Sequence, residues 1–146
     1  MPDKAIEVFT RNIRLTHEGA NIVLNRCIEK ALEIEVPQNI AVVDNAGHLL
    51  CFTRLDGAKF HSIDTAIAKA RASASTGMPS GKIPFEPGLM VSIACPENFT
   101  NLQGGLPIVI HDTLIGGIGV GSGTPDQDIE VAQAGLSALL SFTDAK

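Results

Sequence analysis

The chain contains no tryptophan and no tyrosine, so six phenylalanines are its only Phe, Trp or Tyr residues. Proteins that bind nucleic acid commonly stack bases on aromatic side chains and attract phosphates with a basic surface. This chain has a formal net charge of -5 at pH 7, which opposes phosphate binding. The composition therefore indicates that nucleic acid is not a partner.

Cysteine and metal-binding motifs are also scarce. The three cysteines are far apart in the sequence: Cys27, Cys51 and Cys95. No C-x-x-C, H-x-x-x-H or H-E-x-x-H spacing occurs, so we expect neither a disulfide framework nor a metal site. A metal site assembled from distant segments is the open alternative, and each cysteine is expected to be a small buried thiol.

No apolar run has the length of a membrane-spanning helix, and the first residues lack the basic and apolar segments of a signal peptide. We therefore expect a soluble, cytoplasmic protein without a membrane partner. Hydrophobic residues make up 45% of the chain, and no Pro/Gly/Ser-rich linker interrupts it. This pattern is typical of a single folded domain over residues 1–146.

The first half of the chain shows helical and then extended patterns. Apolar residues recur at three- and four-residue steps between Thr16 and Pro37, which predicts a helix. Thr16 is suited to cap its start, and the helix is expected to end before Pro37. Residues 39–43 form a short apolar strand, residues 44–47 suit a type I turn, and residues 48–54 form the returning strand.

The second half begins with a helix that Ser62 is suited to cap. Residues 77–88 contain three prolines and are expected to form a long loop, which is a candidate pocket wall. Three further strands are expected at residues 89–95, 106–110 and 114–120. Thr124-Pro125-Asp126-Gln127 combines a cap, a first-turn proline and a capping-box glutamine at the start of a last helix. The predicted fold is α+β, with a central antiparallel five-stranded sheet flanked by helices.

Basic residues cluster in the middle of this acidic chain. Between residues 54 and 82 there are two acids, Asp56 and Asp64, and five basic residues. The basic residues are Arg54, Lys59, Lys69, Arg71 and Lys82. This cluster favours a small anionic ligand, although a solvated helix face gives the same pattern.

His61 precedes the predicted helix start, where a histidine that titrates near neutral pH can transfer a proton. Asp56 could orient that histidine or hold a substrate hydroxyl. Two simpler explanations stay open: a local hydrogen bond for His61, and a turn at Asp56-Gly57.

Glycines occur in two notable places. Those in residues 116–123 lie within a predicted strand, which indicates close backbone approach and not a nucleotide loop. Gly104 and Gly105 are expected to line a pocket, with backbone amides available to a carboxylate.

Several strings along the chain resemble those of the GlcG/HbpS family, also described as the haem-degrading or PduO C-terminal-like domain. They are A-V-V-D-N-A-G-H-L, R-L-D-G-A and S-I-D-T-A-I-A-K-A within residues 40–74, G-G-L-P-I-V-I at 104–110, and I-G-G-I-G-V-G at 115–121. The resemblance implies a profilin-like or roadblock-like fold and a homo-oligomer. Arg54, Asp56 and Lys69 coincide with the family pattern.

Haem is the cofactor that the resemblance implies, but one position departs from the pattern. Haem-binding members offer a histidine just before the Leu-Thr that opens the first helix, where this chain has Arg14. His17, His61 and Met78 are residues of the types that can bind haem iron, but no motif supports any of them as the ligand.

Three hypotheses remain open. In the first, the hairpin, Met78 and the 77–88 loop form a groove for haem or another anionic tetrapyrrole, whose propionates bind Arg54, Lys69 and Arg71. In the second, the basic residues hold a small organic acid while His61 and Asp56 transfer a proton in an isomerisation, hydration or hydrolysis. The third is a scaffold subunit that serves only assembly. Arg54, Asp56, His61 and Lys69 are predicted to share one pocket.

Overall fold

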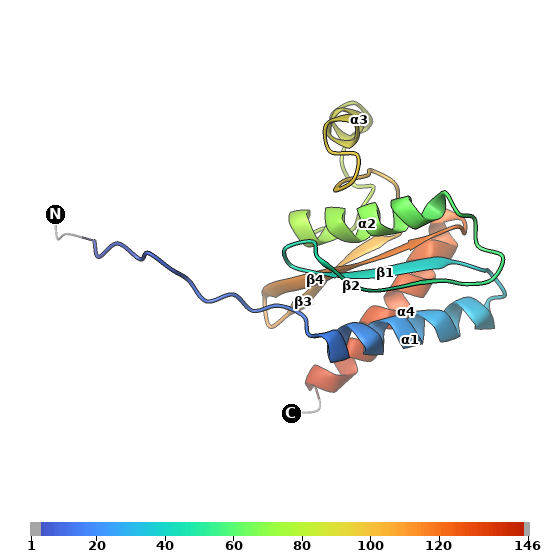
Figure 1. The fold of residues 1–146 in the computed structure, drawn as a ribbon, viewed down its shortest axis with the longest axis horizontal. Coiled ribbons are helices and arrows are strands. Elements are labelled where there is room, and N and C mark those ends of the chain that lie inside the picture. Colours follow the sequence, from blue (N-terminus) through green and yellow to red (C-terminus); the bar gives the residue numbers. More distant parts are fainter. Residues whose placement is uncertain (1–3, 145–146) are drawn as a thin grey trace.

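The computed structural model describes residues 4–144, which form four helices and four strands. The helices are α1 (His17–Glu33), α2 (Ser62–Thr76), α3 (Phe85–Ala94) and α4 (Pro125–Asp144). The strands are β1 (Asn39–Asp44), β2 (Leu49–Arg54), β3 (Gly105–Ile110) and β4 (Thr113–Gly121). Figure 1 shows α1 and α4 on one face of the sheet and α2 on the other, with α3 beyond α2.

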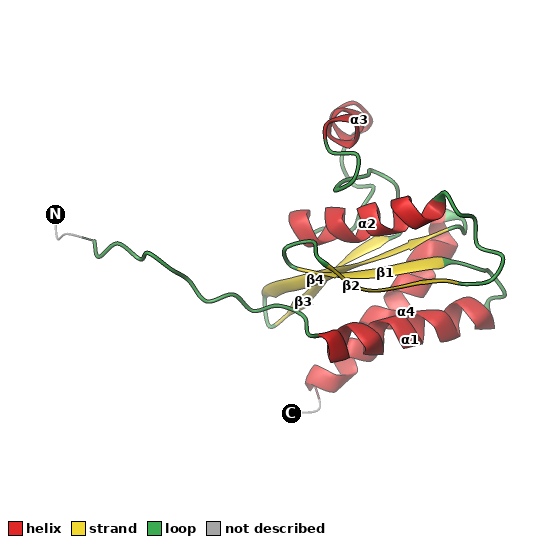
Figure 2. Cartoon of the chain, in the orientation of Figure 1, coloured by secondary structure: helices red, strands yellow, loops and turns green. Residues whose placement is uncertain are grey.

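The four strands form one antiparallel sheet in the order β2-β1-β4-β3. Two hairpins connect sequence neighbours, and β1 pairs with β4 in the centre (Figure 2). β1 is buried along its whole length because helices cover both of its faces. The prediction of an antiparallel sheet flanked by helices is confirmed, but the number of strands is four and not five.

The missing strand is the segment predicted at residues 89–95, which belongs to helix α3 and its end. Short apolar runs fit either a strand or a helix, and the flanking prolines suggested that no helix could form. Pro87 nevertheless lies in the first turn of α3, where its missing N–H costs no intrahelical hydrogen bond. The predicted 77–88 loop therefore ends at Pro84, and α3 replaces the rest of it.

The face covered by α1 and α4 is packed with large aliphatic side chains. Ile40 and Val42 from β1 and Ile118 and Val120 from β4 point to this side and are fully buried. Val131 from α4 packs against them, together with residues of α1. We call this core the α1/α4 layer.

The opposite face carries small residues. Ala41 and Val43 of β1 pack here against three alanines of α2: Ala66, Ala70 and Ala74. A Cβ atom on Gly117 or Gly119 would overlap the α2 backbone. These glycines let α2 approach the sheet closely, as their place in a strand indicated. We call this core the α2 layer.

Two predicted caps are confirmed and one is displaced. The Thr16 hydroxyl accepts a hydrogen bond from the Gly19 N–H at 3.0 Å. Thr124 and Gln127 form a reciprocal capping box, with hydrogen bonds of 2.9 and 3.3 Å. Ser62 is not a cap: it is a buried residue within the first turn of α2, and His61 occupies the cap position without a side-chain hydrogen bond.

The three cysteines differ more than the sequence suggested. Cys27 is buried in the α1/α4 layer, Cys51 is half-buried, and Cys95 is exposed after α3. Burial raises the pKa of Cys27 to about 12 and that of Cys51 to about 11. The prediction of a buried thiol is therefore wrong for Cys95.

Within residues 4–144, no helix is long and apolar enough to cross a membrane.

Candidate ligand-binding site

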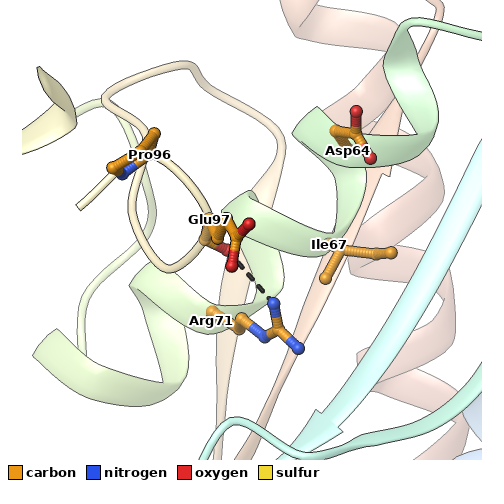
Figure 3. A pocket seen from close by; sticks show the side chains of 5 residues that line it. All are labelled: Asp64, Ile67, Arg71, Pro96 and Glu97. Atoms are coloured by element: carbon orange, nitrogen blue, oxygen red, sulfur yellow. Dashed lines mark hydrogen bonds between the residues drawn. The ribbon is translucent and has the colours of Figure 1, made fainter.

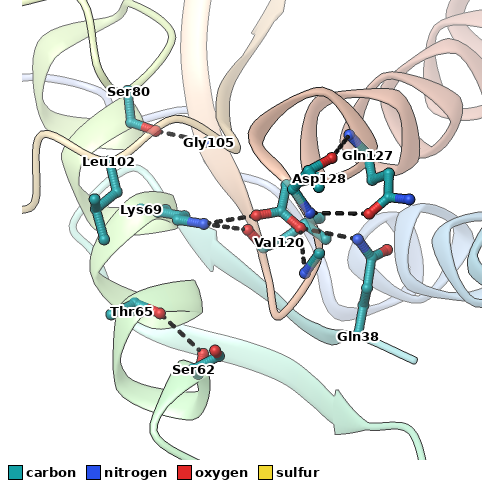
Figure 4. A network of polar contacts seen from close by, with 12 residues as sticks. Gln38, Ser62, Thr65, Lys69, Ser80, Leu102, Gly105, Val120, Gln127 and Asp128 are labelled. Carbon is teal, nitrogen blue, oxygen red and sulfur yellow. Dashed lines mark hydrogen bonds and ion pairs between the residues drawn. The ribbon is translucent and has the colours of Figure 1, made fainter. Parts of the chain in front are cut away.

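A buried ion pair joins the two helical layers around the end of β4. Lys69 of α2 donates a hydrogen bond to the Asp128 carboxylate of α4, with 3.0 Å between Nζ and Oδ2. The same ammonium donates to the Val120 carbonyl at 2.8 Å. Both side chains are at most 5% exposed. Figure 4 shows the two side chains pointing directly at each other.

Asp128 has two further donors. The Gly123 N–H and the Gln38 side-chain amide each donate to Oδ1 at 2.9 Å. Burial raises the pKa of Asp128, while the Lys69 ammonium and these hydrogen bonds act in the opposite direction. The carboxylate therefore connects α2, α4 and the residue before β1 (Figure 4).

A polar pocket of about 250 Å³ opens above this ion pair. Its lining includes Lys59, His61, Thr65, Lys69, Gln103 and Ser122. These residues come from the segment before α2, from α2 itself, from the segment before β3, and from the turn between β4 and α4. We call this cavity the Lys69 pocket. It is the place where side chains from distant segments converge around a buried charge.

The rim of the Lys69 pocket carries its accessible basic groups. Lys59 and His61 are exposed, and the backbone N–H of Lys59 donates to the Ser122 hydroxyl at 2.9 Å. His61 makes an edge-to-face contact with Phe60, with 6.4 Å between the ring centroids. This backbone hydrogen bond connects the segment that carries Lys59 and His61 to Ser122, which follows β4.

The structure brings together only two of the four residues predicted to share a pocket, namely His61 and Lys69. Asp56 lies beside the end of α1, in a separate cavity of about 360 Å³ that also includes Glu35 and Leu55. Arg54 is exposed and donates a hydrogen bond to the Ala58 carbonyl at 3.4 Å. These two residues lie at the end of β2 and in the loop that follows it, and the path of that loop is not encoded in a local sequence pattern.

Arg71 and Met78 lie in two other places. Arg71 donates from Nε to the Gly47 carbonyl at 3.0 Å and from Nη1 to the Glu97 carbonyl at 3.1 Å. It lines a cavity of about 430 Å³ beside Asp64 and Glu97 (Figure 3). Met78 lines a cavity of only about 10 Å³. The groove predicted from the hairpin, Met78 and the three basic residues is therefore not formed.

Gly104 passes beside the ion pair, and the amide of Gly105, contrary to the prediction, is not free. The Gly105 N–H donates to the Ser80 hydroxyl at 2.8 Å. Gly104 has a φ of +124°, and a Cβ there would lie 3.0 Å from the Lys69 ammonium. Glycine is needed here because a side chain would displace the ion pair.

Asp128 was not predicted as a site residue, although its carboxylate pairs with the buried Lys69 ammonium. It is one of two acids in the first turn of α4, where the helix dipole favours carboxylates, so its position in the sequence does not indicate a buried charge. Gln38 was missed for a similar reason. Gln38 and Asp128 are both buried because β1 and α4 bring them together beside Lys69, which the basic cluster and the family pattern had both singled out. Within residues 4–144, no group of three or more His, Cys, Asp or Glu side chains could hold a metal ion.

Comparison with known proteins connects this fold to one family. The family model described as haem degrading protein HbpS-like matches residues 15–137. An uncharacterized 15.0 kDa protein from the dhaT-dhaS intergenic region of Citrobacter freundii is 32% identical over 115 residues. The match covers 75% of this chain and 81% of that protein.

Solved structures show the same arrangement. Protein ORFY of Klebsiella pneumoniae has a TM-score of 0.89 at 26% identity, covering 94% of this chain and 99% of that one. A double mutant of Streptomyces reticuli HbpS has a TM-score of 0.81 at 28% identity, covering 95% and 97%. The complex of PduOC with haem has a TM-score of 0.80, covering 86% and 95%, and its 22% identity establishes similarity of fold alone.

Proposed function

The chain belongs to the HbpS-like family, as its sequence motifs indicated, and we propose that it binds a small anionic molecule in the Lys69 pocket. The observation that carries this proposal is the buried Lys69–Asp128 pair beneath a pocket with an accessible basic rim. Buried ion pairs are costly to form, so their presence beneath a cavity favours a functional role.

The chemistry of the pocket favours a carboxylate or a similar oxyanion. Asp128 neutralises the charge of Lys69, so Lys59 and His61 supply the accessible positive charge, His61 when it is protonated. Ser122 accepts a hydrogen bond from the Lys59 N–H, so its own hydroxyl proton can be donated to an oxyanion. A pocket of about 250 Å³ suits a molecule smaller than drug-sized ligands, which occupy roughly 300–1,000 Å³.

Haem is the second candidate ligand, and the family match is what favours it. The cavities of this chain do not fit an enclosed haem. Two cavities of about 430 and 470 Å³ have no His, Cys, Met or Tyr side chain in their lining to bind iron. The pockets that contain His61 and Met78 are smaller, at about 250 and 10 Å³. His17 is exposed and lies 3.1 Å from the Asn21 amide.

Proton-transfer catalysis by a His61–Asp56 pair has little geometric support, because the two residues line different cavities. His61 alone beside a bound carboxylic acid is compatible with general acid or base catalysis. That role depends on binding, so binding is tested first.

The first experiment is calorimetric titration of the protein with a panel of mono- and dicarboxylates. We expect saturable binding of at least one member, weakened about tenfold or more in Lys59→Ala and in His61→Ala. Lys82→Ala is the matched control, since it removes an exposed basic residue of the same sequence cluster outside the Lys69 pocket. Binding that is equally weakened by all three variants would reflect general charge and would contradict the proposed site.

A parallel titration with haemin separates the two ligand candidates. The proposal predicts no saturable Soret shift that depends on His61. A saturable shift that His61→Ala abolishes, without carboxylate binding, would replace the small anion by haem as the ligand.

A further inference from the structure

Helix α3 presents apolar side chains to solvent although it belongs to a folded chain. Phe85, Met90 and Ile93 are 80%, 64% and 71% exposed, and the buried residue of the helix is Gly88. α3 stands beyond α2, on the side away from the sheet (Figure 1). Contiguous exposed apolar surface of this kind marks an interaction site.

A groove lies along one side of α3. It has a volume of about 470 Å³, and Phe85, Leu89 and Leu102 contribute apolar lining. Ser92, Thr100 and Asn101 line the remainder. The groove and the exposed face of α3 together offer an apolar docking surface, which we call the α3 surface.

The segment before α1 has the complementary property. Residues 4–14 form neither helix nor strand, and every one of them is exposed. Four of them are large and apolar: Ile6, Val8, Phe9 and Ile13. The segment is fixed at its root, where the Leu15 N–H donates to the Ile115 carbonyl at 3.0 Å, and then extends away from the body (Figure 1). We call residues 4–14 the arm.

We propose that the arm of one copy packs on the α3 surface of a second copy, forming a reciprocal homo-oligomer. Charge supports this choice of occupant. The arm has three basic residues and one acid in a chain of net charge -5, whereas α3 and the segment that follows it contribute Glu86 and Glu97. Opposite charges at the edge of an apolar contact favour this pairing over other partners.

The apolar surface available is of the order that a stable dimer buries. Fully burying one large apolar side chain removes roughly 60–120 Å² of surface from water. Four such side chains in the arm and about five on the α3 surface, counted twice in a two-fold arrangement, would bury roughly 1,000–2,000 Å². Stable protein interfaces bury roughly 1,200–2,000 Å². The proposal goes beyond the ligand-binding function and does not depend on the Lys69 pocket.

Light scattering after size exclusion tests the proposal on the full chain. We expect the native chain to be at least a dimer, and Phe9→Asp and Ile93→Asp each to shift it to monomer with unchanged circular dichroism. Leu32→Asp is the matched control, because Leu32 is 63% exposed on α1 and belongs to neither surface. A monomeric native chain, or an oligomer that both variants leave intact, would overturn the proposal.

Disulfide trapping distinguishes contact between copies from contact within one copy. Cys95 is exposed at the end of α3, whereas Cys27 and Cys51 are more buried and their raised pKa values keep them protonated at neutral pH. A tagged Thr10→Cys/Cys95→Ser chain is mixed with native chain and oxidised. We expect the mixed disulfide dimer to exceed the two like-with-like dimers. A second sample contains the Thr10→Cys chain with Cys95 retained. If this chain forms an internal disulfide and the first sample forms no mixed dimer, the arm covers its own helix and the proposal is contradicted.

Discussion

The two faces of the sheet pack against their helices in different ways. The α1/α4 layer is filled by large side chains such as Ile40, Val42 and Ile118. In the α2 layer, the backbone of α2 lies directly against the sheet, with its alanines over Gly117 and Gly119. Alternating residues of one strand supply both patterns, because successive side chains of β4 point to opposite faces. The α1/α4 layer is held by side-chain volume and the α2 layer by close backbone approach.

That difference explains where the site forms. Because α2 lies close to β4, the Lys69 side chain reaches the Val120 carbonyl and continues to Asp128 on α4. A larger residue at Gly104 would push this ion pair apart. The small residues of the α2 layer therefore serve the site as well as the fold, whereas the α1/α4 layer serves the fold.

The largest expected effect comes from breaking the ion pair that links the two layers. Lys69→Met retains the aliphatic stem but leaves Asp128 buried without its cation, which should lower the free energy of unfolding by about 3–5 kcal/mol. Urea unfolding at neutral pH measures the change.

The double variant Lys69→Met/Asp128→Asn is the control for that experiment. It removes the remaining charge while keeping an oxygen that accepts from Gly123 and Gln38. We expect it to recover more than half of the lost stability. A double variant no more stable than Lys69→Met would show that lost packing, and not the unpaired carboxylate, causes the effect.

The next effect compares the two packing strategies directly. Ile118→Ala leaves a cavity in the α1/α4 layer and should cost about 2–5 kcal/mol. Gly119→Ala forces a methyl group against the α2 backbone and should cost about 1–3 kcal/mol. Thermal and urea unfolding of both variants check these values.

Gly121→Ala is the matched control within β4, because its nearest neighbour, the Ser62 carbonyl oxygen, would lie 3.2 Å from the new Cβ. It should cost clearly less than Gly119→Ala. Equal costs at the two glycines would argue against close backbone approach as the organising feature of the α2 layer.

Substitutions at the helix caps should change stability less, and by different amounts in the two layers. Thr16→Ala removes the hydroxyl that caps α1 and should cost about 1 kcal/mol. His61→Ala removes a residue that makes no capping hydrogen bond to α2, so stability should change little while ligand binding weakens. Unfolding and calorimetric titration of the two variants measure this contrast. A loss of stability in His61→Ala as large as that in Thr16→Ala would assign His61 a structural role.

The smallest effect concerns the β1–β2 turn, which connects two strands of the sheet between the layers. Burial acts to raise the pKa of Asp44, but hydrogen bonds from the Ala46 and His48 N–H groups and the nearby His48 ring hold it below its ordinary value. A lowered pKa in the folded state stabilises the protein above the unfolded value of about 3.9, and this contribution is lost as the pH falls through the folded pKa. Unfolding measured below pH 5 should therefore show a steeper loss of stability in the native chain than in Asp44→Asn. Identical pH profiles would exclude this contribution.

Local signals in the sequence were sufficient for most elements of the fold. The caps at Thr16 and Thr124 and the turn before Gly47 depend on neighbouring residues, and each was confirmed. The segment at residues 89–95 was predicted wrongly because its apolar run has no periodicity that separates strand from helix. α3 forms outside the sheet, so no sheet partner was there to make it a strand.

The candidate site was predictable only in part. His61 and Lys69 were identified, whereas Arg54, Asp56, Arg71 and Met78 lie elsewhere. Their spacing along the chain was compatible with a shared pocket, but Arg54 and Asp56 lie at the end of β2 and after it, whereas Arg71 and Met78 lie on α2 and after it. Asp128 is 59 residues from Lys69 in sequence, and no local pattern connects the two.

The sequence by itself determined the family, the order of most elements, and the alternation of large and small residues along β4 that separates the two layers. Those properties depend on neighbours in the chain or on motifs. Only the tertiary structure decided that Asp128 neutralises Lys69 and that α3 stands exposed. The physical reason is that burial and charge pairing depend on which distant segments meet, and packing of the whole chain determines that.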